Sequence, residues 1–131
     1  MKRVISNPIF HFDNERERKD FQEILDAQQI LYEGFTTESG EICEVYKTFQ
    51  LDELNCIYDE MCVLYTYHSD MIDAEENMNE AKRMMQIHIN DDNAINMLAE
   101  EAKIFVQSYN VYVEAKQFYN DKLDSLKTKK W

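Results

Sequence analysis

The strongest constraint on this chain is an apolar stripe that runs from Asp91 to Leu126. Alternate steps of three and four residues through this stretch meet ten side chains, of which nine can be buried and the tenth is a lysine: Ile95, Leu98, Ala102, Phe105, Tyr109, Tyr112, Lys116, Tyr119, Leu123 and Leu126. A helix needs this coiled-coil spacing to keep one face against a neighbouring helix. The stripe therefore predicts a long helix over about 92–128.

The same spacing recurs between Leu54 and Ile89, where eight of eleven positions are apolar. It predicts a second long helix, over about 52–90. The polar run from Asn90 to Asn93 separates the two stripes and indicates a short turn. Two stripes of equal period joined by a short turn indicate an antiparallel helical hairpin.

The first forty residues are expected to hold an arm and a helix. Residues 1–12 place several apolar side chains around Pro8, which predicts an extended arm lying on a core. Asp13 or Asn14 can cap a helix over about 14–34, and Gly34 is placed to end it.

Residues 40–50 are ambiguous between helix and strand. Ile42, Val45, Tyr46 and Phe49 fit one face of a helix, whereas the alternation that a strand requires is imperfect. A strand would also lack an obvious partner, and an isolated strand leaves its backbone groups unsatisfied. We choose a helix.

Composition favours an all-α fold in one domain. The 131 residues include two glycines and one proline, so the chain has few of the residues that form the tight turns of sheets and hairpins. We predict a single domain, 1–131, in which the hairpin over 51–131 packs as an elongated bundle with one or two short helices from 13–50 and the arm 1–12.

Charge and cysteine content exclude several classes of function. The 26 acidic and 14 basic residues give a net charge of −12, which argues against direct binding of nucleic acid or anionic membranes. The three cysteines show no metal-ligand spacing, and no apolar run approaches the ~20 residues that span a bilayer. We expect a cytoplasmic protein with reduced thiols, no cofactor and no bound metal.

No motif for catalysis stands in the sequence, and we predict that the protein is not an enzyme. His68 and Glu75 fall on the inner stripe and His88 near its end, but the Glu-x-x-His pairs of a di-metal bundle are missing, so a metal-binding enzyme is the least favoured interpretation. Reflection of the hairpin about residue 92 instead predicts buried polar layers, with Glu75 facing Tyr109 and His68 facing Lys116.

Apolar side chains off the inner stripe are the best candidates for function. Uncovered apolar surface usually marks a contact with another protein. We predict a protein-binding module, an adaptor, inhibitor or assembly factor, whose partner is another protein or a second copy of the chain in a homodimer. The candidate partner-binding residues are Tyr58, Tyr65, Ile72, Val106, Val113 and Phe118.

An alternative function is mimicry of nucleic acid, as in small viral counter-defence proteins. Carboxylates arrayed on rigid helices can imitate phosphates and block a nucleic-acid-binding enzyme. Such binding should weaken steeply with salt, whereas binding through an apolar strip should not. The candidates are Glu15, Glu17, Asp20, Glu23, Asp26, Glu33, Asp70, Asp73, Glu76 and Glu80.

Overall fold

The computed structural model describes residues 3–89 and 95–131, with side chains from residue 97 onward in the second range. The elements are β1 (Val4–Ser6), β2 (Ile9–Phe12), α1 (Glu15–Ala27), β3 (Tyr32–Thr37), β4 (Gly40–Val45), β5 (Thr48–Gln50), α2 (Leu51–His88) and α3 (Ile95–Thr128). They divide into two compact units. We call residues 1–65 with 121–131 the sheet unit, and residues 66–120 the hairpin unit.

The all-α prediction is wrong. The described residues form five strands in two antiparallel sheets beside three helices, so the fold is mixed. The arm 1–12 contains β1 and β2, and residues 40–50, which we expected to be helical, form β4 and β5. The end of the expected first helix forms β3.

The three-stranded sheet has the order β2-β4-β3, and β1 pairs separately with β5. Central β4 therefore has a partner on each side: Cys43 lies opposite Phe10 of β2 and opposite Gly34 of β3. The sequence conceals both partners of β4, because β2 lies within the expected arm and β3 begins at the end of the expected first helix. The pairing of β2 with β4 joins residues about thirty positions apart, which no local pattern displays.

Helix α1 begins where expected but ends early. The side chain of Asn14 accepts a hydrogen bond from the backbone N–H of Glu17, so Asn14 is the N-cap. The chain leaves the helix through Gln29, whose φ of 60° is left-handed, and the helix does not reach Gly34. Gly34 instead lies in β3 against α1, where an added Cβ would come within 2.2 Å of the Gln22 Nε2 atom.

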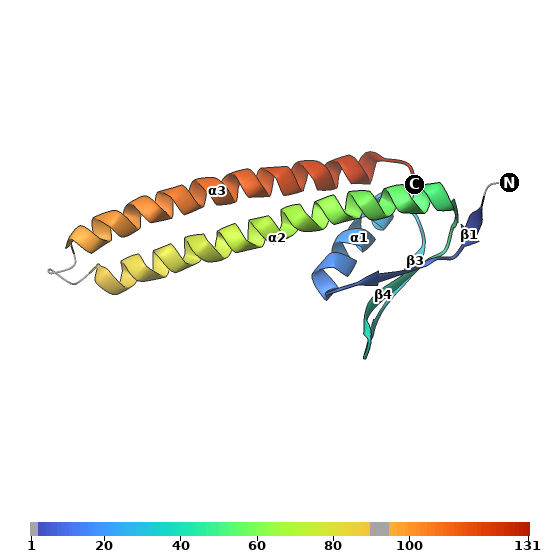
Figure 1. The fold of residues 1–131 in the computed structure, drawn as a ribbon, viewed down its shortest axis with the longest axis horizontal. Coiled ribbons are helices and arrows are strands. Elements are labelled where there is room, and N and C mark those ends of the chain that lie inside the picture. Colours follow the sequence, from blue (N-terminus) through green and yellow to red (C-terminus); the bar gives the residue numbers. More distant parts are fainter. Residues whose placement is uncertain (1–2, 90–94) are drawn as a thin grey trace. The chain divides into compact units, whose positions relative to one another are not determined.

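The core of the sheet unit lies where α1 covers the sheet (Figure 1). The ring of Phe21 is 4.6 Å from that of Phe10 and 5.4 Å from that of Phe12. The other fully or nearly buried apolar side chains of this unit are Ile24, Leu25, Cys43, Val45, Phe49, Ile57, Met61, Leu64, Leu123 and Leu126.

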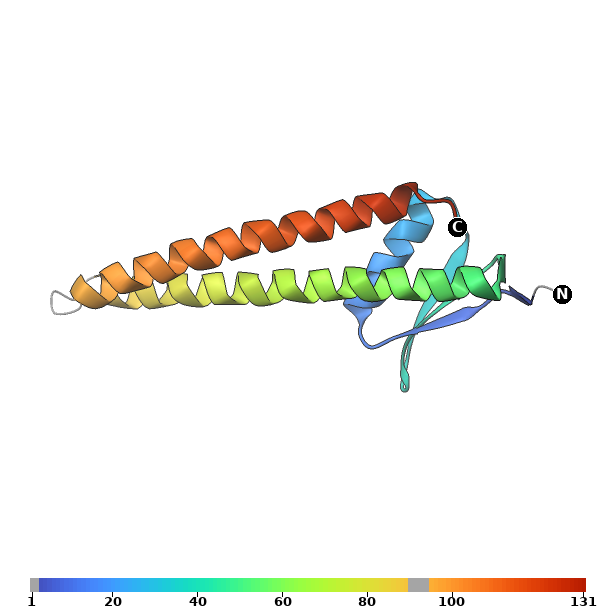
Figure 2. The same cartoon turned by 45° about the horizontal axis from the view of Figure 1, so that its top comes forward.

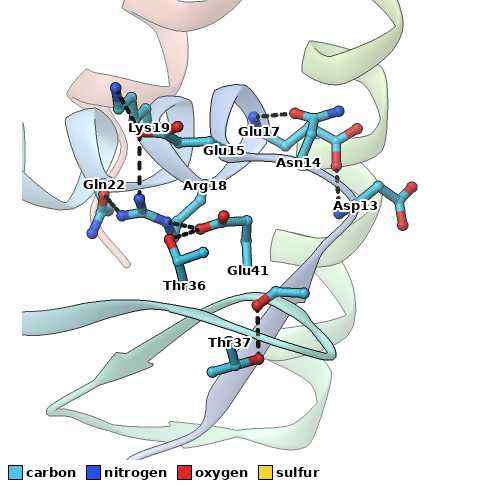
Figure 3. Close-up of polar contacts among 11 residues, drawn as sticks. Asp13, Asn14, Glu15, Glu17, Arg18, Lys19, Gln22, Thr36, Thr37 and Glu41 are labelled. Carbon is cyan, nitrogen blue, oxygen red and sulfur yellow. Dashed lines mark hydrogen bonds and ion pairs between the residues drawn. The ribbon is translucent and has the colours of Figure 1, made fainter.

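A polar cluster joins α1 to the β3–β4 hairpin (Figure 3). The Arg18 Nε atom lies 2.7 Å from a Glu41 carboxylate oxygen, and Arg18 also donates to the side-chain oxygen of Gln22. Thr36 donates to the same Glu41 oxygen at 2.9 Å. Both charges are mostly buried, so this ion pair fixes the helix on the sheet more strongly than a solvated pair would.

In the hairpin unit, α2 and α3 lie side by side and antiparallel (Figures 1 and 2). The two long helices match the predicted ones, although the expected turn at Asn90–Asn93 lies outside the described residues. In the ranges that the structure covers, no helix has both the length and the apolar character to cross a membrane.

The buried stripe of α2 differs from the predicted one in its second half. Ala74 and Ala81 are buried, whereas Glu75 and Lys82 are exposed. The inside positions are taken by the residue before each predicted one, because the methyl groups of Ala74 and Ala81 can be buried freely, whereas burial of the Glu75 and Lys82 charges would be costly.

The expected buried polar layers do not form. Glu75, Tyr109 and Lys116 are exposed, so neither expected pair is enclosed. His68 is half-buried, and its ring lies 4.4 Å from that of Tyr119. Tyr119 takes the place beside His68 that was predicted for Lys116.

Candidate functional site

A groove runs along the seam between α2 and α3 in the hairpin unit. It consists of two adjoining hollows of about 450 and 340 Å³, both lined by Asn77. Helix α2 also contributes Tyr67, Asp70, Asp73, Ala74, Glu80, Ala81 and Met84; helix α3 contributes Glu101, Ile104, Ser108, Val111, Glu114, Ala115 and Phe118.

The floor of this groove is made of small side chains. Ala74 and Ala81 are seven residues apart on α2, and Ser108 and Ala115 are seven apart on α3. Seven residues are nearly two helical turns, so each pair lies along one line of its helix. Small residues at these positions leave the groove open between the larger side chains on either side.

One wall of the groove is an exposed apolar row on α3. Ile104, Val111 and Phe118 repeat every seven residues and are 49%, 58% and 50% exposed. The ring of Phe118 stacks on that of Tyr67 from α2, with centroids 5.8 Å apart. This contact holds the end of the row in place while leaving half of Phe118 open to solvent.

The acidic residues of the groove divide into two groups. At one end, Glu80 pairs with Arg83 at 2.6 Å and Glu101 pairs with His88 at 2.8 Å. At the other end Asp70, Asp73 and Glu114 surround the hollow that contains Phe118, and none of them forms an ion pair within the described part of the chain. The open negative charge is therefore concentrated beside Phe118.

The predicted partner-binding residues do not form one surface. Phe118 lines the groove. Val106 and Val113 are 55% and 46% exposed, but Val113 lies about 200° round α3 from Val111, so these valines occupy another flank. Ile72 is half-buried on α2.

The remaining two predicted residues, Tyr58 and Tyr65, belong to the sheet unit. Tyr58 is 69% exposed, and a hydrogen bond with Cys62 raises the pKa of its hydroxyl. Tyr65 packs edge-on against Phe12, with centroids 6.3 Å apart, and burial raises the pKa of its hydroxyl. Tyr65 is thus part of the packing of the sheet unit and offers little surface to a partner.

The predicted acidic face is also divided. On α1, Glu15 pairs with Lys19, Glu23 pairs with Lys127, and Asp20 is buried. Glu17 accepts a hydrogen bond from the backbone of Asp13.

The last acidic candidates of the sheet unit are Asp26 and Glu33, whose carboxylates accept hydrogen bonds from tyrosines. Burial raises the pKa of the Tyr32 phenol to about 12, and the hydrogen bond that Tyr32 donates to Asp26 adds to this shift. Glu33 lies in β3 and accepts from Tyr46 at 2.8 Å. On α2, by contrast, Asp70, Asp73 and Glu80 line the groove, and Glu76 is exposed outside it.

A larger hollow of about 610 Å³ lies in the sheet unit beside Trp131. Its lining mixes lysines with carboxylates, and Lys129 already forms an ion pair with Glu60. Trp131 itself packs on Phe21, and its backbone N–H donates a hydrogen bond to the Gln28 side chain, so Trp131 is part of the packing of the sheet unit. This hollow has neither an apolar row nor an open charge of one sign.

The residues that sequence reasoning missed are Ile104, Val111 and the small residues of the floor. A second seven-residue repeat, through 104, 111 and 118, runs beside the main stripe and could have revealed the row. Its importance depends on the neighbouring alanines of α2, which the predicted stripe had assigned to the outside.

No three His, Cys, Asp or Glu residues gather closely enough to hold a metal ion in the described ranges. Comparison of the chain with models of protein families, with curated proteins and with solved structures gives no match.

Proposed function

We propose that the protein is a non-catalytic protein-binding module, an adaptor, inhibitor or assembly factor, that acts through the groove of its hairpin unit. The observation that carries this proposal is the exposed row of Ile104, Val111 and Phe118. Among the described side chains of the hairpin unit, the buried ones are Ala74, Ala81 and Tyr119. A pair of helices that buries so little of its own apolar surface is suited to receive a partner.

The row can supply a useful share of a binding energy. Full burial of a large apolar side chain is favourable by about 1.5–3 kcal/mol, and each of the three is about half exposed. Covering them would therefore contribute roughly 2–4 kcal/mol before the costs of association. The rest must come from the floor and the polar rim, as in other interfaces with an apolar centre.

Affinity capture from the cells that make the protein tests the proposal. Val111→Asp places a charge on the row at an exposed helical position, and Val113→Asp makes the same change on the other flank of α3. We expect the chain to capture one specific protein. Val111→Asp should lower the affinity for this partner by at least about tenfold, which is the effect of removing one interface anchor, whereas Val113→Asp should leave the affinity unchanged. Circular dichroism of both variants checks that the helices persist.

The opposite result would point to a different surface. Loss of the partner with Val113→Asp but not Val111→Asp would place the binding site on the flank of Val106 and reject the groove. The salt dependence of the affinity tests the alternative function, mimicry of nucleic acid. A partner whose affinity falls steeply between low and physiological salt, and does not depend on Val111, would favour mimicry.

The proposed setting is the cytoplasm, where Cys43, Cys56 and Cys62 would stay reduced. None of the three cysteines forms a disulfide in the structure, which is compatible with this setting. A homodimer also stays a prediction.

A further inference from the structure

We propose that the groove binds one amphipathic helix of the partner, with basic residues on the flank that faces Asp70 and Asp73. This inference rests on the proposed function and adds the chemistry of the partner. It follows from the form of the groove and from the sign and position of its open charges.

The form of the groove suits a helix. Ile104 and Phe118 are fourteen residues apart on α3, which at ~1.5 Å per residue gives a row about 21 Å long, or four turns of a partner helix. The seven-residue repeat of the row matches apolar residues that recur every three and four positions on the partner. The small floor residues allow a third helix to approach closely.

An extended peptide fits less well. Strand addition requires an open sheet edge whose backbone groups can pair with the peptide. The groove is bounded by α2 and α3, whose backbone groups are hydrogen-bonded within each helix. Its recognition must therefore use side chains, and an amphipathic helix presents the most regular row of them.

The charges of the groove select a basic helix. Among the lining residues that the structure describes, none is a lysine or arginine, whereas five are acidic. Glu80 and Glu101 are already paired with Arg83 and His88. The open carboxylates of Asp70, Asp73 and Glu114 lie at the Phe118 end, so the basic residues of the partner should cluster at that end.

A second copy of the hairpin unit is a poor occupant. The unit has ten acidic and four basic residues, a net charge of −6, so two copies would bring like charges together. Charge complementarity thus favours a basic partner of different sequence.

A displayed library of 18-residue helical peptides, selected on the full chain, tests this inference. We expect enriched clones to combine apolar residues at three- and four-residue spacing with lysine or arginine on one flank. In fluorescence anisotropy, these clones should bind Val111→Asp at least about tenfold more weakly than the unchanged chain. The double variant Asp70→Asn, Asp73→Asn should weaken binding by about threefold to tenfold, because each exposed ion pair contributes modestly.

Glu76→Gln is the matched control, since Glu76 is exposed on α2 outside the groove and its change should leave affinity within about twofold. Selection that yields no binder, or only clones without a basic flank, would overturn the inference. Affinity that does not change in the Asp70 and Asp73 variant, or clones that reproduce a segment of this chain, would also overturn it. If capture of a protein partner still depends on Val111 in that event, the proposed function stands and only the nature of the bound segment is rejected.

Discussion

At the scale of single residues, burial gives the three thiols different chemistry. Cys43 lies in central β4 and is completely buried, and burial raises the pKa of its thiol to about 11. Cys56 and Cys62 are exposed on α2. Because the thiolate is the reactive form, Cys43 is protected both by access and by protonation.

We therefore predict that two thiols of the folded protein react quickly with an aromatic disulfide reagent at pH 8, and that the third reacts only when the protein unfolds. Denaturant should speed the third reaction, because opening of the fold exposes the Cys43 thiol and removes the burial that raises its pKa. The variant Cys56→Ser, Cys62→Ser should retain only the slow phase. Three equal rates at pH 8 would show that Cys43 is not enclosed in the sheet.

Asn14 and Gly34 both have a clear local preference, but only Asn14 lies where that preference predicts. Asn14 caps α1 as its side chain predicts. Gly34 was expected to end that helix, but its lack of a side chain is used where β3 passes close to Arg18 and Gln22. The same chemical property, absence of a Cβ, serves both situations, so the residue type could not decide between them.

At the scale of elements, the choice between neighbouring positions of α2 decides which residues face the seam. Ala74 and Ala81 take the positions that a strict seven-residue repeat assigned to Glu75 and Lys82. This exchange has a functional consequence, because two small residues at the seam leave room for the groove. It also removes Glu75 from the polar layer that we expected it to form with Tyr109 inside the hairpin.

The exchange predicts unequal effects for two neighbouring substitutions. Ala74→Glu puts a charged side chain at a position that is 4% exposed and should lower the free energy of unfolding by about 1–3 kcal/mol. Glu75→Ala alters an exposed position and should change it by less than about 0.5 kcal/mol. Denaturant unfolding followed by circular dichroism measures both. A larger cost for Glu75→Ala would restore the original stripe.

At the scale of the whole molecule, the two units differ in how they are stabilised. Most of the large buried side chains belong to the sheet unit, where two sheets, α1 and the ends of α2 and α3 meet. Among the side chains that the structure describes, few of those in the hairpin unit are buried, and the net charge of this unit is −6. A partner that covers its groove should therefore add more to the stability of the hairpin unit than to that of the sheet unit.

This difference leads to a prediction about self-association. Since like charge opposes a second copy in the groove, we expect any homodimer to use another surface and Val111→Asp to leave the solution mass unchanged. Sedimentation velocity at micromolar concentration compares the variant with the unchanged chain, and Val113→Asp serves as the control. A dimer that Val111→Asp alone dissociates would make the groove a self-association site.

The sequence by itself determined the two long helices, because the spacing of apolar residues from Leu54 to Leu126 is a local property that a helix satisfies within its own length. It also pointed to Phe118, Asp70, Asp73 and Glu80, although as members of larger sets. Only the tertiary structure decided the sheet, because β4 depends on partners distant along the chain. It also decided the groove, because the packing of α2 beside α3 determines which exposed side chains become neighbours.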